Sequence, residues 1–85
     1  MILSLIDSRG ELRLLDAEEI IFLQTNGSGD LNLYTYDEQY RAVSLFKDWS
    51  ALLHSEGFLR MDRGTIVNTR KIVSYDRSLR VVTLL

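Results

Sequence analysis

The residues best suited to chemistry lie between Phe58 and Ile72, where arginines, small polar side chains and a glycine fall within fifteen residues. A planar guanidinium binds phosphate or the edge of guanine, and hydroxyl and amide groups also contact nucleic-acid backbones. The candidate contacts in this segment are Arg60, Arg63, Gly64, Thr65, Asn68, Arg70 and Lys71. The pattern indicates a surface for an anion, although a solvated pair of strands could carry the same residues.

The charge of the chain is divided along its length. Residues 60–80 hold six basic and two acidic residues, a net of +4, whereas residues 1–59 hold four basic and ten acidic residues, a net of −6. Because the screening length at physiological salt is about 8 Å, a local cationic segment can act on a polyanion while the acidic remainder is screened. The overall net charge of −2 argues against a protein that binds nucleic acid indiscriminately.

Other chemistries find little support in the composition. The chain has one histidine, His54, and no cysteine, so neither a nucleophile–base pair nor a Cys/His metal site can be assembled. We expect no enzymatic activity, no metal and no cofactor. No apolar run approaches the roughly 18 residues of a membrane span, and the absence of cysteine fits a reducing compartment, so we expect a cytoplasmic protein.

The elements that must position these residues are mostly strands. Short apolar or alternating segments between turn residues predict strands at Ile2–Ile6, Glu11–Leu15, Ile20–Leu23, Leu31–Tyr36, Gln39–Val43, Phe58–Met61, Thr65–Val67, Lys71–Tyr75 and Leu79–Leu84. One helix is predicted around residues 44–56, capped by Ser44 and ended by Gly57. Its apolar stripe is Leu45, Phe46, Trp49, Leu52 and Leu53. The sequence therefore predicts a single, mainly β domain over residues 1–85, with antiparallel sheets and one flanking helix.

The segment that begins at Phe58 resembles the sequence pattern of LytTR DNA-binding domains, the output module of many bacterial response regulators. That pattern runs F-x-R-x-H-R-S-x-I-V-N, with an isoleucine four residues later. The matching residues are Phe58, Arg60, Arg63, Ile66, Val67, Asn68 and Ile72. The resemblance covers about residues 11–85. It implies elongated antiparallel sheets with a flanking helix, and loops that enter successive major grooves of double-stranded DNA at direct-repeat promoter sites.

Carried onto this sequence, the resemblance implies DNA contacts by Arg63 and Thr65, with Arg60 nearby. A second contact loop corresponds to residues 26–30 and includes Asn26 and Ser28. The chain departs from the family at Asp62, which replaces histidine, at Gly64, which replaces serine, and at Asp30 in the second loop. It also stops at Leu85, where the family usually continues, which suggests a short, stand-alone form.

Two functions follow from these observations. The first is a sequence-specific transcription regulator that binds duplex DNA. The alternative is an interaction module or antagonist that has lost DNA binding and pairs with itself or with a full-length regulator. Structural roles also remain open for single residues: Arg63 could pair with Asp62 or Asp76, Asp62 could instead bond a backbone turn, and Asn68 could be structural. Tyrosines that could stack on bases are expected to pack on the sheet instead, namely Tyr34, Tyr36, Tyr40 and Tyr75.

Overall fold

The protein is built almost entirely from antiparallel strands. The computed structural model describes residues 1–26, 30–42, 49, 51, 53–76, 78–79 and 81–85. Its strands are β1 (Ile2–Ile6), β2 (Leu12–Asp16), β3 (Phe22–Thr25), β4 (Leu31–Tyr34), β5 (Gln39–Ala42), β6 (Phe58–Asp62), β7 (Thr65–Asn68), β8 (Ile72–Asp76) and β9 (Val81–Leu84). Each corresponds to a strand predicted from the sequence, so the mainly β fold is confirmed.

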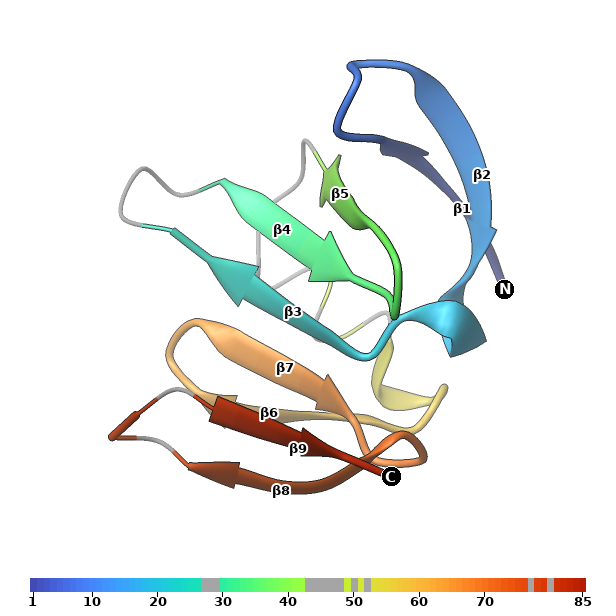
Figure 1. The fold of residues 1–85 in the computed structure, drawn as a ribbon. Helices are drawn as coiled ribbons and strands as arrows, with labels where there is room; N and C mark the ends of the chain where they lie inside the picture. Colours follow the sequence, from blue (N-terminus) through green and yellow to red (C-terminus); the bar gives the residue numbers. More distant parts are fainter. Residues whose placement is uncertain (27–29, 43–48, 50, 52, 77, 80) are drawn as a thin grey trace.

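The strands form two sheets (Figure 1). Seven strands pair in the order β2-β1-β5-β4-β3-β7-β6, and β8 and β9 form a separate hairpin sheet. The β1–β2 hairpin joins the other strands through the pair Ile6–Arg41 between β1 and β5. At the other end of the order, β7 connects β3 to β6. The antiparallel pairing of β3 with β7 brings turns from distant parts of the sequence to one end of the sheet.

The β3–β4 hairpin shows why alternation in the sequence predicts the fold. Leu31 and Leu33 of β4 are fully buried, and Asn32 and Tyr34 between them are partly exposed. On the other face, Phe22 of β3 lies opposite Tyr34, and their rings stack with centroids 4.5 Å apart. Cross-strand pairs of this kind stabilise one register, because a shift of a single residue would turn the leucines toward solvent.

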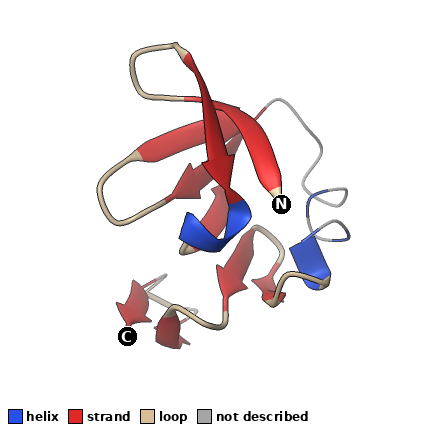
Figure 2. Cartoon of the chain, turned by 90° about the vertical axis from the view of Figure 1, so that its right-hand side faces the viewer, coloured by secondary structure: helices blue, strands red, loops and turns tan. Residues whose placement is uncertain are grey.

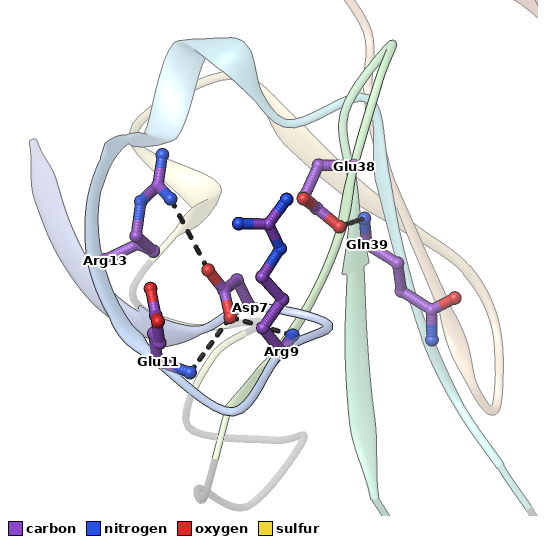
Figure 3. Close-up of polar contacts among 6 residues, drawn as sticks. All are labelled: Asp7, Arg9, Glu11, Arg13, Glu38 and Gln39. Carbon is purple, nitrogen blue, oxygen red and sulfur yellow. Dashed lines mark hydrogen bonds and ion pairs between the residues drawn. The ribbon is translucent and has the colours of Figure 1, made fainter.

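The turn between β1 and β2 is held by the carboxylate of Asp7 (Figure 3). The backbone N–H groups of Arg9 and Glu11 each donate to its Oδ1 at 2.9 Å, and Arg13 forms an ion pair with Oδ2 at 3.4 Å. The hydrogen bond from Glu11 is the leading cause that lowers the pKa of Asp7, and burial opposes it. Gly10 completes the turn with a φ of 84°, a conformation in which glycine avoids the Cβ clash.

The hydrophobic core contains side chains from most of the large sheet together with Trp49, Leu53 and Phe58, which are buried as the sequence predicts. Trp49, Ala51, Leu53 and His54 are helical, and Gly57 follows with a φ of 88°, as expected for the residue that ends a helix. The rest of the predicted stripe (Leu45, Phe46 and Leu52) and the predicted cap Ser44 lie outside the described residues. Figure 2 shows the helical segments among the described residues beside the strands.

The predicted strand Ile20–Leu23 is displaced toward the C-terminus. Asp16 caps a 3-10 helix at Ala17–Glu19 by accepting from the N–H of Glu18 at 3.1 Å. The N–H of Ile20 then donates back to the carbonyl of Ala17, so this residue closes the helical turn, and β3 begins at Phe22. Within the described part of the chain, no helix has the length and apolar character needed to cross a membrane.

Candidate nucleic-acid interface

Two segments far apart in the sequence meet at one end of the large sheet. β3 pairs with β7 so that Gln24 lies opposite Thr65, and the N–H of Thr25 donates to the carbonyl of Gly64 at 2.9 Å. The turn at residues 62–64, hereafter the Arg63 turn, therefore lies beside the start of loop 26–30 (Figure 1). The sequence could name both segments as candidates, and the register between β3 and β7 makes them neighbours.

The two arginines of the Arg63 turn have different surroundings. Arg60 donates from Nε to the carbonyl of Asp62 at 3.1 Å and from Nη2 to the carbonyl of Arg63 at 3.0 Å. Its guanidinium thus clamps the backbone of the turn. Arg63 is exposed, and none of the ion pairs between described residues involves it. The alternative in which Arg63 pairs with Asp62 or Asp76 is therefore not observed among the described residues.

Asp62 braces the same turn through both carboxylate oxygens. Oδ1 accepts from the N–H of Gly64 at 2.9 Å, and Oδ2 accepts from the hydroxyl of Tyr75 at 2.7 Å. Because hydrogen bonds to a carboxylate are stronger than neutral ones, this arrangement fixes the backbone around Arg63. The hypothesis that Asp62 bonds a backbone turn is confirmed. The irregular register between Arg60 and Asp62 on β6 accommodates the turn.

Three of the predicted site residues lie in the interior. Gly64 is buried, Thr65 is 0% exposed and Asn68 is 1% exposed. Asn68 donates from Nδ2 to the carbonyl of Ile20 at 2.9 Å and accepts at Oδ1 from the N–H of Arg70 at 3.1 Å. The contact with DNA implied for the Thr65 side chain finds no support in this placement, because a fully buried hydroxyl cannot meet a macromolecule unless the strand moves.

Two of the other predicted residues, Arg70 and Lys71, lie away from the Arg63 turn. Arg70 and Lys71 follow the opposite end of β7, where they line an open pocket of about 290 Å³ with Glu18, Glu19 and Glu56. The ammonium of Lys71 also lies 5.6 Å from the centre of the Tyr36 ring. Strand β7 separates this pair from the Arg63 turn, so the structure does not gather all the predicted cations into one surface.

Loop 26–30 is closed by its first and last residues. Asn26 donates from Nδ2 to Oδ2 of Asp30 at 3.3 Å, and the N–H of Asp30 donates back to Oδ1 of Asn26 at 3.0 Å. Asp30 thus has a local role in shaping the loop. Ser28, and the basic residues Arg77 and Arg80, lie outside the described residues.

Comparison with known proteins decides the family. A model of the LytTr DNA-binding domain matches residues 10–85 of the 85-residue chain. The chain belongs to the LytTR family. A search of curated proteins found no match. LytTR is a family of DNA-binding domains and not a catalytic family.

Tyr75 and Gln24 are the residues near the Arg63 turn of this LytTR domain that sequence reasoning missed. Tyr75 was expected to pack on a sheet, yet its hydroxyl lies 2.7 Å from Asp62 and 3.3 Å from Oγ1 of Thr65. Gln24 reaches the same Thr65 oxygen from β3, at 3.5 Å. No signal in the sequence pairs these residues, which lie 10 to 41 positions from Thr65, because their proximity depends on how the strands and the two sheets pack.

Proposed function

We propose that this LytTR domain is a sequence-specific transcription regulator that reads duplex DNA through the Arg63 turn. The single observation that carries the proposal is an exposed Arg63 on a turn whose backbone is braced by Arg60 and Asp62. The major groove is about 12 Å wide, so the turn that joins β6 and β7 at the end of the sheet can enter it. Arg63 can then donate two hydrogen bonds to O6 and N7 of guanine.

We assign the remaining candidate residues either to DNA contact or to a structural role. We propose a second contact from loop 26–30, through Asn26, which follows the Thr25 N–H bonded to Gly64, and through Ser28, which lies outside the described residues. Thr65 and Asn68 keep β7 in place from the interior, and buried Gly64 lets the backbone turn close to β3. We place Arg70 and Lys71 outside the primary contact, because they lie among glutamates at the other end of β7.

A single domain of this kind makes few phosphate contacts, so its affinity as a monomer should be modest. Two copies on direct-repeat sites gain affinity, because binding of the first copy raises the effective concentration of the second when they contact each other. This arrangement matches the sites implied by the family resemblance. It needs no symmetric dimer in free solution.

The experiment is a titration of fluorescent duplex DNA, at low and moderate salt, with the wild type, Arg63→Ala and Arg70→Ala. Both variants lose one positive charge, but they lose it at opposite ends of β7. We expect Arg63→Ala to weaken specific binding by about 1–3 kcal/mol, the usual value of a bidentate arginine–guanine contact. Arg70→Ala should lose much less. Equal losses would show that only net charge matters and would refute the assignment.

The alternative, a self-pairing module, draws on a different observation. Strand β2 forms an edge of the large sheet, and its Leu12 and Leu14 are 67% and 72% exposed. An exposed apolar edge strand can pair with another strand, here with β2 of a second copy. Light scattering over a range of concentrations tests this. A dimer that Leu14→Lys dissociates would favour self-pairing, and a monomer at all concentrations would oppose it.

A further inference from the structure

The hydroxyl of Tyr75 joins the two sheets beside the Arg63 turn. Tyr75 lies on β8 of the small sheet, and its partners Asp62 and Thr65 lie on β6 and β7 of the large one. The bond to Asp62 is short, at 2.7 Å, as is usual when a hydroxyl donates to a carboxylate. The Asp62 carboxylate also accepts from the N–H of Gly64, so the Asp62 side chain connects Tyr75 of the small sheet to the backbone next to Arg63.

The chemistry of these groups fixes the direction of each hydrogen bond. A tyrosine hydroxyl has one proton to donate, and Tyr75 donates it in the hydrogen bond to Asp62, which as a carboxylate can only accept. At the 3.3 Å contact the tyrosine oxygen must then accept, so Thr65 donates. The threonine oxygen in turn can accept from Nε2 of Gln24 at 3.5 Å. A directed series therefore runs from β3 through β7 and β8 and ends on the carboxylate that braces the turn.

We propose that Tyr75 is a positioning residue for DNA recognition, acting through Asp62 on the Arg63 turn; this inference rests on the proposed function. The hydroxyl does two things at once. It holds the Asp62 carboxylate in the orientation in which Oδ1 accepts from Gly64, and it satisfies the charge of that carboxylate within the protein. Without the hydroxyl, the Asp62 carboxylate loses one of its hydrogen bonds, and the turn that carries Arg63 loosens.

The first test uses the free protein, so it does not depend on any DNA. Amide hydrogen exchange of Gly64, followed by NMR, should be faster in Tyr75→Phe than in the wild type, because the acceptor of that N–H has lost its support. Tyr36→Phe is the matched control, since Tyr36 is exposed, and it should leave Gly64 exchange unchanged. Unchanged exchange in Tyr75→Phe would overturn the proposal. Should this variant not fold, the wild type still decides: a slowly exchanging Tyr75 hydroxyl proton supports the proposal, and a rapidly exchanging one contradicts it.

The second test measures DNA binding at a temperature where all variants are folded. Tyr75→Phe should bind about tenfold more weakly, the order expected when one hydrogen bond to a charged group is lost. Its salt dependence should equal that of the wild type, because no phosphate contact is removed. A purely structural role would lower the melting temperature and leave this affinity unchanged, and that result would overturn the proposal. Failure of the wild type to bind any DNA would refute the proposed function, whereas the exchange experiment would still decide whether Tyr75 positions the turn.

Discussion

The substitution Asn68→Ala tests whether Asn68 stabilises the fold or contacts DNA. Asn68 was a candidate for DNA contact, yet the structure buries it completely and gives its amide two partners. Nδ2 donates to the carbonyl of Ile20, just before β3, and Oδ1 accepts from the N–H of Arg70, just after β7. The side chain therefore ties the two strands that bring the Arg63 turn to loop 26–30. Loss of this side chain should lower the free energy of unfolding much more than it lowers the affinity for DNA.

The magnitude follows from these two hydrogen bonds. A net hydrogen bond contributes about 0.5–1.5 kcal/mol, and a buried group left without its partner costs about 1–3 kcal/mol, so Asn68→Ala should lower the free energy of unfolding by about 2–4 kcal/mol. For a domain of this size each kcal/mol lowers the melting temperature by about 4–8 °C, which corresponds to a fall of about 8–32 °C. A change this large is a substantial fraction of the stability of a small domain.

The assay is urea and thermal unfolding monitored by circular dichroism, with Asn32→Ala as the matched control. Asn32 is a partly exposed asparagine on β4, and its substitution should change the free energy of unfolding by less than about 0.5 kcal/mol. DNA binding by Asn68→Ala, measured where the variant is folded, should stay within a few-fold of the wild type. A stable Asn68→Ala protein that has lost DNA binding would refute the reasoning, because it would make Asn68 a contact residue.

Two further predictions concern the turns. Hydrogen bonding lowers the pKa of Asp7 below its ordinary value, so the stability it contributes is complete above the unfolded-state pKa and is lost as pH falls through the folded-state pKa. Asp7→Asn should therefore reduce stability at pH 7 and flatten the decline below about pH 4. Parallel wild-type and variant curves in acid unfolding would contradict this. Gly57→Ala should destabilise the fold more than Gly10→Ala. Both glycines have a positive φ, which costs about 1–2 kcal/mol for alanine. A Cβ at position 57 would also lie 3.3 Å from Nε of Arg70, whereas a Cβ at position 10 would meet open space. Equal losses of stability in thermal unfolding would show that the Arg70 side chain simply moves away.

The elements of the fold could be predicted where their causes are local. Alternation placed Leu31 and Leu33 on the buried face of β4, and the turn residues from Asp7 to Gly10 marked the first hairpin. The boundary at Ile20 was predicted less well, because its apolar side chain suits a strand while its N–H closes the preceding 3-10 turn. The spacing of apolar residues predicts which side chains are buried, but it does not predict which carbonyl a backbone N–H will bond.

The candidate site could be predicted only in part, since its arrangement depends on pairing between distant strands. Residue type named Arg63 as a candidate contact, and it left the role of Asp62 open. It could not show that Thr65 is buried, because its burial follows from the position of β7 between β3 and β6. Nor could it pair Tyr75 with Asp62, which belong to different sheets.

The most direct test of the central claim is the salt dependence of DNA binding with and without the Arg63 side chain. We predict that the wild type binds duplex DNA with an affinity that falls as salt rises, and that Arg63→Ala binds specific sites about tenfold to a hundredfold more weakly, in line with a contact to guanine. Wild-type and Arg63→Ala proteins with the same affinity at every salt concentration would contradict it.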